Sequence, residues 1–151
     1  MANIKILVGT VYGNAQDVAE MCRENLVAAG HEVSLLRQAT IDEVVVDETE
    51  ILLVCTSTTG QGEIPDSLLL LYCQLQDKQP DLKHVKYGLI SLGDSSYDTY
   101  AEAGWLMDEL FQKMEMQRIG EPLLIDACET LTPNEPAENW LVGWADSIAS
   151  K

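Results

Sequence analysis

Three polar segments of the sequence could hold a ligand, and each directly follows a run of apolar residues: Thr10–Ala15, Thr56–Asp66 and Gly93–Tyr100. In the first, backbone N–H groups and hydroxyls at a helix N-terminus could converge on a phosphate. Each charge-assisted hydrogen bond is worth roughly 1.5–3 kcal/mol, so four or five could hold a dianion without a cationic side chain. On its own, such a segment is more often an ordinary helix start capped by Thr or Asn.

The first segment lacks the features of two common nucleotide-binding loops. It has no lysine, which a P-loop needs to reach β- and γ-phosphates, and no adjacent Lys-Ser or Lys-Thr pair to complete a Mg²⁺ site. Its pattern also differs from G-x-G-x-x-G, and no acidic residue ends the second apolar strand to bind a ribose. The sequence therefore argues against a P-loop nucleotidase and against a Rossmann dinucleotide site.

The elements that must position these segments alternate between strands and helices. Continuous apolar runs are typical of strands buried on both faces of a parallel sheet, and Gly30 is well placed as a helix C-cap before one more strand. The expected strands are Ile4–Val8, His31–Leu36, Ile51–Thr56, Tyr87–Leu92 and Leu123–Ile125. Helical spacing of apolar residues recurs between them, in Val18–Leu26, Ser67–Gln76 (opened by Pro65-Asp66), Ala103–Met114 and Trp140–Ile148. The Met and Trp stripes in these helices predict core packing.

We expect one doubly wound α/β domain of 151 residues, a size that buries roughly 70% of the unfolded surface. In open sheets of this kind, ligands bind outside the carboxyl ends of the strands, where the strand order reverses. The three polar segments should therefore share one site. The segment Gln38–Glu50 is the least clear, because its Val44–Val46 fits either a short helical turn or an extra edge piece.

The charge balance points to basic partners. Nine Lys and Arg residues against 25 Asp and Glu residues give a net charge of −16, which would repel duplex nucleic acid and anionic membranes. The start of the sequence lacks a signal-peptide pattern, and no apolar stretch approaches the roughly 18 residues of a membrane span. These features predict a cytoplasmic protein. His31 and His84 precede strands, so we expect them on the surface, at the opposite edge of the sheet from the site.

The cysteines predict neither a metal site nor a disulfide framework. Cys22, Cys55, Cys73 and Cys128 are widely spaced, without a C-x-x-C pair or a nearby His. The first three lie within apolar patterns and are expected to be small core residues. Reduced thiols suit a cytoplasmic location.

Together, the three segments resemble the flavodoxin family in order and spacing over nearly the whole chain. T-V-Y-G-N-A at Thr10–Ala15 stands at the family's FMN phosphate loop, T-T-G-Q-G at Thr58–Gly62 where the family covers one face of the flavin, and L-G-D-S-S-Y at Leu92–Tyr97 where its Tyr covers the other. The last strand, expected to run unbroken from about Gly120 to Asp126, is similar to short-chain flavodoxins, especially the small MioC-like and YqcA-like bacterial group. The GDSSY and TTGQGE motifs also resemble the FMN domains of cytochrome P450 reductases and sulfite reductases, which are diflavin reductases.

The resemblance implies a five-stranded sheet in the order 2-1-3-4-5 and a set of FMN-binding residues. That set is Thr10, Val11, Tyr12, Gly13, Asn14, Ala15, Thr58, Thr59, Gly60, Gln61, Gly62, Leu92, Gly93, Asp94, Tyr97, Tyr100 and Ala101. Within it, Tyr97 would stack on the flavin, the Gly60 carbonyl would accept a hydrogen bond from the flavin N5–H when the ring takes up an electron, and the Gln61 amide would face O4. Thr59 stands where many relatives have Trp or Tyr, and Ala15 where many have Thr. These two departures imply less coverage of the ring and a weaker hold on the phosphate.

The acidic residues near the predicted site favour a solvated rim over a catalytic set. They are Glu63, Asp66, Asp94, Asp98, Glu102, Asp126 and Glu129. Negative charge close to a flavin would raise the energy of its anionic, fully reduced form and so lower its potential. The same rim would dock a basic redox partner.

The resemblance implies an electron-transfer protein: a monomer that binds FMN and shuttles electrons from an NAD(P)H-dependent reductase to acceptor enzymes, without turnover of its own substrate. The alternative is a flavoprotein oxidoreductase of the NAD(P)H:quinone reductase type, although such relatives usually have longer loops and form dimers or tetramers. A phospho-receiver module shares the strand order but needs an Asp at the end of the third strand. Thr56-Ser57 stands there instead, so the sequence argues strongly against a receiver.

Overall fold

The computed structural model describes residues 3–9, 14–45, 49–57, 64–93, 102–126 and 134–149. Strands and helices alternate along the chain, as the apolar runs predict. The strands are β1 (Asn3–Gly9), β2 (Glu32–Leu36), β3 (Ile51–Ser57), β4 (Lys86–Gly93), β5 (Gln117–Arg118) and β6 (Leu123–Asp126). The helices are α1 (Asn14–Ala28), α2 (Ile41–Val44), α3 (Asp66–Lys78), α4 (Glu102–Lys113) and α5 (Asn134–Ala149).

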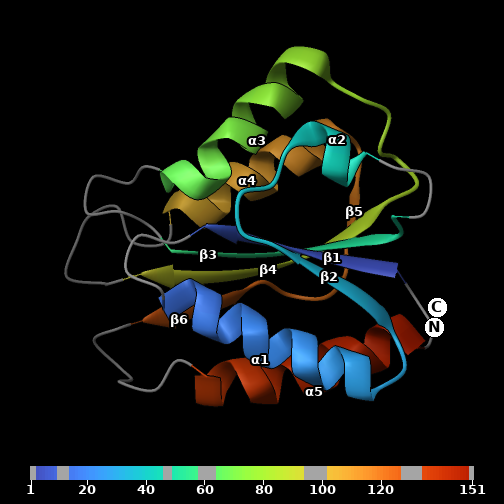
Figure 1. Cartoon of the computed structure of the whole chain (residues 1–151), viewed down its shortest axis with the longest axis vertical. Helices are drawn as coiled ribbons and strands as arrows, with labels where there is room; N and C mark the ends of the chain where they lie inside the picture. The colour runs from blue at the N-terminus through green and yellow to red at the C-terminus, as the bar shows by residue number, and fades with distance from the viewer. Residues whose placement is uncertain are drawn as a thin grey trace.

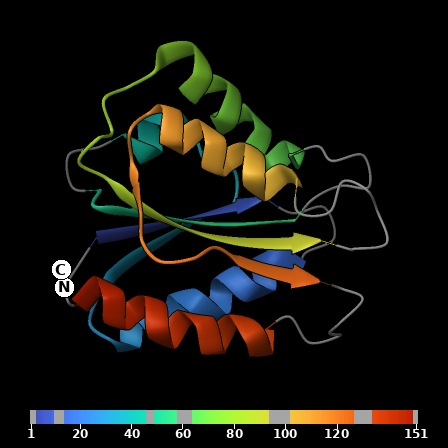
Figure 2. The ribbon, with the colours of Figure 1, turned by 180° about the vertical axis from the view of Figure 1, so that it is seen from behind.

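The strands form one parallel sheet in the predicted order. β2 pairs with β1, β1 with β3, and β3 with β4, and both β5 and β6 pair with β4 on its outer side. The arrowheads of β1, β4 and β6 all point to one edge of the sheet, at the right in Figure 2. The order 2-1-3-4-5 is therefore confirmed, with two short strands sharing the fifth position.

The prediction of an unbroken last strand from Gly120 to Asp126 is wrong. Pairing with β4 starts earlier, at Gln117–Arg118, stops after the Ile119 N–H has bonded to the Tyr87 carbonyl oxygen, and resumes at Leu123. Gly120 has a φ of +71°, which turns the backbone out of the extended conformation. Pro122 has no N–H to donate to a ladder. These two residues divide the strand.

Helices cover both faces of the sheet and create two cores. In Figure 1, α2, α3 and α4 lie on one side of the sheet and α1 and α5 on the other. The predicted stripes face these cores, since Val18, Cys22, Met107 and Phe111 are all fully buried and Trp144 nearly so. None of the helices in the described ranges is long and apolar enough to cross a bilayer.

The helix ends follow the local sequence. α1 ends just before Gly30, whose φ is +95°, and the His31 N–H bonds back to the Leu26 carbonyl oxygen. In the segment Gln38–Glu50, a short helix covers Ile41–Val44, where the Thr40 N–H donates to the Glu43 carboxylate. Of the segment Val44–Val46, Val44 is helical and Val45 follows the helix as its C-cap. Val46 lies outside the described residues.

The prediction that Cys73 is a core residue is wrong. The buried stripe of α3 is Leu68, Leu71 and Leu75, and Cys73 lies on the opposite, exposed side of that helix. Cys22 and Cys55 are buried, as expected. Cys128 lies outside the described residues.

α5 approaches the sheet closely at one glycine. A Cβ on Gly88 of β4 would lie 2.6 Å from the Trp144 indole, so the ring occupies the space that a side chain would need. Trp144 also stacks on Trp140, with ring centroids 5.5 Å apart. The Trp140 indole N–H donates to the Glu121 carbonyl oxygen at 2.9 Å. Through these contacts, α5 holds the segment that joins β5 to β6.

A polar cluster ties β4, α4 and β5 together at the amino end of the sheet. The Tyr87 hydroxyl donates to the Asp108 carboxylate at 2.7 Å and accepts a hydrogen bond from the Gln112 amide at 3.1 Å. The Arg118 guanidinium pairs with the same Asp108 oxygen at 2.9 Å. Burial, together with the hydrogen bond to Asp108, raises the pKa of the Tyr87 hydroxyl well above its usual range.

We predict that Tyr87→Phe lowers the free energy of unfolding by about 1–2 kcal/mol at pH 7, because the bond to a carboxylate is lost. The folded chain also keeps the Tyr87 proton at a pH where the unfolded chain, with a tyrosine pKa near 10, has lost it. The stability that the protonated Tyr87 hydroxyl contributes is complete below pH ~10 and is lost as the pH rises further. Urea unfolding of both chains between pH 7 and 11 should therefore show their stabilities converging. A difference that stays constant above pH 10 would contradict the assignment.

Candidate functional site

The carboxyl ends of four strands meet at one edge of the sheet. Gly9 of β1 pairs with Thr56 of β3, and the last residue of β3 pairs with Leu92 of β4. Gly93, the last residue of β4, pairs with Asp126 of β6. All three polar segments that the sequence singles out leave the sheet from this edge, which is called the site edge below.

The structure places only part of the predicted site. Asn14, Ala15, Leu92 and Gly93 belong to the described residues and lie at the site edge. The rest of the predicted set lies outside the described residues: Thr10, Val11, Tyr12, Gly13, Thr58, Thr59, Gly60, Gln61, Gly62, Asp94, Tyr97, Tyr100 and Ala101.

The start of α1 supplies donors at the site edge. The helix begins at Asn14, five residues after β1 ends at Gly9, and the first four N–H groups of a helix have no partner within it. These groups, with the positive end of the helix dipole, favour an anion. The Ala15 side chain is fully buried in the core between α1, α5 and the sheet, so this residue can offer only its backbone to a ligand.

Side chains from β3 and α3 donate hydrogen bonds to the described residues on either side of the segment 10–13. At one end, the Ser57 hydroxyl donates to the Gly9 carbonyl oxygen at 3.4 Å, and the Ser67 hydroxyl donates to the Val8 carbonyl oxygen at 3.4 Å. At the other end, the Cys55 thiol donates to the Ala15 carbonyl oxygen at 3.2 Å. The sequence interpretation missed these contacts and assigned Cys55 to the core alone. The one signal of these contacts in the sequence was the run of thiol and hydroxyl residues Cys55–Ser57 at the end of a buried strand.

The end of β1 has no room for a side chain. A Cβ on Gly9 would lie 2.6 Å from Thr56 Oγ1 and 3.0 Å from the Leu68 Cβ. Thr56 is itself fully buried, and its hydroxyl donates to the Ser57 carbonyl oxygen at 2.9 Å. The last residue of β1 is therefore packed tightly against β3 and α3.

Charge is distributed unevenly between the two edges of the sheet. At the site edge, Asp66 and Glu102 are exposed in the first turns of α3 and α4. Asp126 was expected in the solvated rim, but it is only 8% exposed at the end of β6, so that expectation is wrong. The other acids of the predicted rim, Glu63, Asp94, Asp98 and Glu129, lie outside the described residues.

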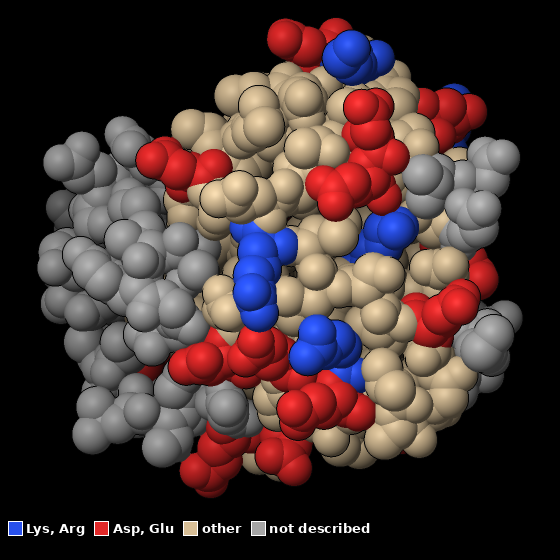
Figure 3. Space-filling model, in the orientation of Figure 1, with Lys and Arg blue, Asp and Glu red and all other residues tan. Residues whose placement is uncertain are grey.

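Most of the described basic residues lie at the opposite edge. They are Lys78 and Lys113 at the ends of α3 and α4, Lys83 in the connection between α3 and β4, Lys86 at the start of β4, and Arg118 in β5. Arg37 is an exception, because it follows β2, but its guanidinium pairs with Glu20 at 3.2 Å. On the face in Figure 3, basic side chains gather near the middle and acidic ones border them.

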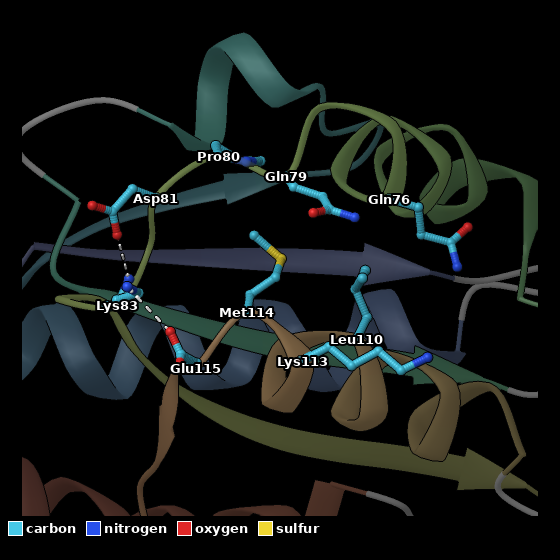
Figure 4. Close-up of a pocket in the computed structure, with 9 residues that line it drawn as sticks. All are labelled: Gln76, Gln79, Pro80, Asp81, Lys83, Leu110, Lys113, Met114 and Glu115. Carbon is cyan, nitrogen blue, oxygen red and sulfur yellow. Dashed lines mark hydrogen bonds and ion pairs between the residues drawn. The ribbon is translucent and has the colours of Figure 1, made fainter.

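An open groove of about 640 Å³ lies at this opposite edge, between the ends of α3 and α4. Figure 4 shows Gln76 and Gln79 facing Leu110 and Met114 across it. The Lys83 ammonium in its wall pairs with Glu115 at 3.2 Å, so its charge is already balanced. The groove is therefore separated from the predicted site by the length of the strands.

The two histidines also lie at this opposite edge, as the sequence predicts. His84 is exposed in the connection that leads into β4, and His31 is half-buried just before β2. Neither lies at the site edge, so the described residues place no imidazole beside the predicted FMN site.

These features define a doubly wound α/β protein in which the start of α1 lies at the same edge of the sheet as the ends of β1, β3 and β4. The model of the flavodoxin family matches residues 6–140 of this chain. Flavodoxin YqcA of Pectobacterium carotovorum subsp. carotovorum is 43% identical over 148 residues, which cover 98% of each chain. Flavodoxin YqcA of Escherichia coli K12 is 40% identical, over 99% of this chain and 100% of its own.

A solved structure agrees with these matches. A flavodoxin from Pseudomonas aeruginosa, in a mutant form with one cysteine replaced by serine, superposes with a TM-score of 0.91 at 42% identity, covering 96% of this chain and 97% of its own. The chain belongs to the flavodoxin family, whose members bind FMN.

The described residues fit FMN. Its phosphate is a single terminal dianion, which suits the first N–H groups of α1, because these groups have no partner within the helix. The start of α1 lies at the same edge of the sheet as Gly9. The Gly9 carbonyl oxygen accepts a hydrogen bond from the Ser57 hydroxyl. Few of the described basic side chains lie at this edge. A phosphate that is held and not transferred needs no lysine of the P-loop kind.

We predict that Gly9→Ala lowers the free energy of unfolding by about 1–3 kcal/mol, because Thr56 and Leu68 must move to admit the methyl group. Gly143→Ala is the matched control. Nothing lies within 4 Å of a Cβ at that helical position, so alanine should stabilise the chain there by about 0.5–1 kcal/mol. Urea unfolding of the three chains measures both effects, and equal stability of Gly9→Ala and wild type would contradict the packing argument.

Proposed function

We propose that this protein is an electron carrier that receives electrons from an NAD(P)H-dependent reductase and passes them to acceptor enzymes through bound FMN. When bound, FMN supplies a ring that accepts and releases electrons. One observation carries the proposal: in a chain of the flavodoxin family, the ends of β1, β3 and β4 and the start of α1 adjoin at one edge.

In this proposal, the segments next to the described strand ends bind different parts of FMN. Thr10–Ala15 hold the phosphate with backbone amides and hydroxyls, at the N-terminus of α1. Thr58–Gly62 cover one face of the ring, and Gly60 lets a carbonyl turn at little cost. Leu92–Asp94 line the polar edge of the ring, while Tyr97, with Tyr100 and Ala101 nearby, covers the other face. The order and spacing of the motifs support these assignments.

The surface beside the site edge supports docking of a basic partner. Asp66 and Glu102 are exposed there, at the starts of α3 and α4. Leu69, Leu70 and Trp105 are exposed apolar side chains in the first halves of the same helices. Acidic residues steer a basic protein toward this edge, and apolar side chains contribute contact area once it has arrived.

We predict that the purified protein loaded with FMN shows flavin bands that NADPH alone does not bleach. Addition of an NADPH-dependent flavodoxin reductase should bleach them within seconds to minutes, and a suitable acceptor should restore them. Stopped-flow and steady-state absorbance measure both steps. Rapid NADPH oxidation by the protein alone would favour the quinone-reductase alternative instead.

A site variant connects this activity to the proposed residues. Tyr97→Ala should weaken FMN binding about tenfold, because a stacked aromatic ring is lost, whereas Tyr97→Phe should bind nearly as wild type. Fluorescence titration measures both variants. A protein that neither shows flavin bands nor quenches flavin fluorescence after refolding with FMN would contradict the whole proposal.

We predict that Asp66→Asn slows reduction by a basic reductase about two- to threefold at low ionic strength, because one steering charge is lost. Asp77→Asn is the matched control, since it removes the same charge from the other end of α3 and is also exposed. Its effect should be smaller, and both effects should shrink in high salt. Equal rate changes in the two variants would argue against docking at the site edge.

A further inference from the structure

We propose that Cys55 is a positioning residue for the FMN phosphate site, acting through the first turn of α1. Its thiol holds the Ala15 peptide, and with it the N–H groups that face the phosphate. This inference rests on the proposed function, in which the start of α1 binds the phosphate.

The contact joins two distant parts of the chain in the interior. Cys55 lies on β3, Ala15 lies in the first turn of α1, and both side chains are fully buried. The Cys55 Sγ donates to the Ala15 carbonyl oxygen at 3.2 Å, across 40 residues of sequence. Burial raises the pKa of the Cys55 thiol well above its usual range, so the sulfur keeps the proton that it donates.

The position of the acceptor gives this bond its effect. Ala15 is the second residue of α1, so its peptide belongs to the turn that carries the free N–H groups. A hydrogen bond from β3 to that peptide fixes how far the turn lies from the strand and how it is rotated. In the sequence, β3 is followed directly by Thr58–Gly62, the segment proposed to cover the ring.

A second buried cysteine offers a matched control. Cys22 is also fully buried in the core between α1, α5 and the sheet. It lies seven residues beyond Ala15 on α1, about two turns away from the helix start. Removing its sulfur makes a similar void in the same core without touching the Ala15 carbonyl.

The test compares FMN with riboflavin, which has the same ring and no phosphate. Dissociation constants for both are measured by fluorescence titration in wild type, Cys55→Ala, Cys55→Val, Cys55→Ser and Cys22→Ala. We expect Cys55→Ala and Cys55→Val to weaken FMN binding about three- to tenfold while riboflavin binding stays unchanged. Cys55→Ser keeps a donor and should restore the preference for FMN, and Cys22→Ala should preserve it.

Each other outcome overturns a defined part of the argument. A wild type that binds riboflavin as tightly as FMN would overturn the proposed phosphate site, and this inference with it. A wild type that prefers FMN, with the same preference in Cys55→Ala and Cys55→Val, would overturn the role of Cys55 alone. So would an equal loss in Cys22→Ala, or a loss in Cys55→Ala that Cys55→Val restores, because a void in the core would then explain the effect.

Discussion

Strand β3 is the element on which the rest of the molecule depends. It pairs with β1 on one side and β4 on the other, and all its residues except Ser57 are buried. Leu53 and Cys55 face the core with α1 and α5, whereas Leu52 and Val54 face the core with α3 and α4. A shift of pairing by one residue would exchange these faces, so both cores specify the register that brings the strand ends together.

Much of the fold and the order of the site motifs could be predicted from the sequence, because burial on both faces of β1, β3 and β4 leaves a strong local pattern. The division of the last strand was missed, because Gly120 and Pro122 act on pairing with a neighbour that local pattern does not identify. Cys73 was misplaced because α3 is apolar around more of its surface than its buried stripe requires. The hydrogen bond from the Cys55 thiol to Ala15 could not be predicted either. It joins β3 to α1, and these elements meet only after β1 has paired with β3 in register.

Parallel strands joined by helices gather all the long helix starts at one edge of the sheet. Each of these starts carries an acidic residue in its first turn: Asp17 in α1, Asp66 in α3, Glu102 in α4 and Glu135 in α5. Such residues complement the positive end of a helix dipole. The same side chains therefore stabilise the helices and give this edge its negative charge, in a chain whose net charge is −16.

The break between β5 and β6 also affects how the sheet ends. An intact outer strand would present a continuous row of unpaired N–H and C=O groups, a template on which another chain could add a strand. Here that row is interrupted at Gly120 and lacks a donor at Pro122. At the other margin, β2 is short and exposes Glu32. Both margins of the sheet thus resist the edge-to-edge pairing that leads to aggregation.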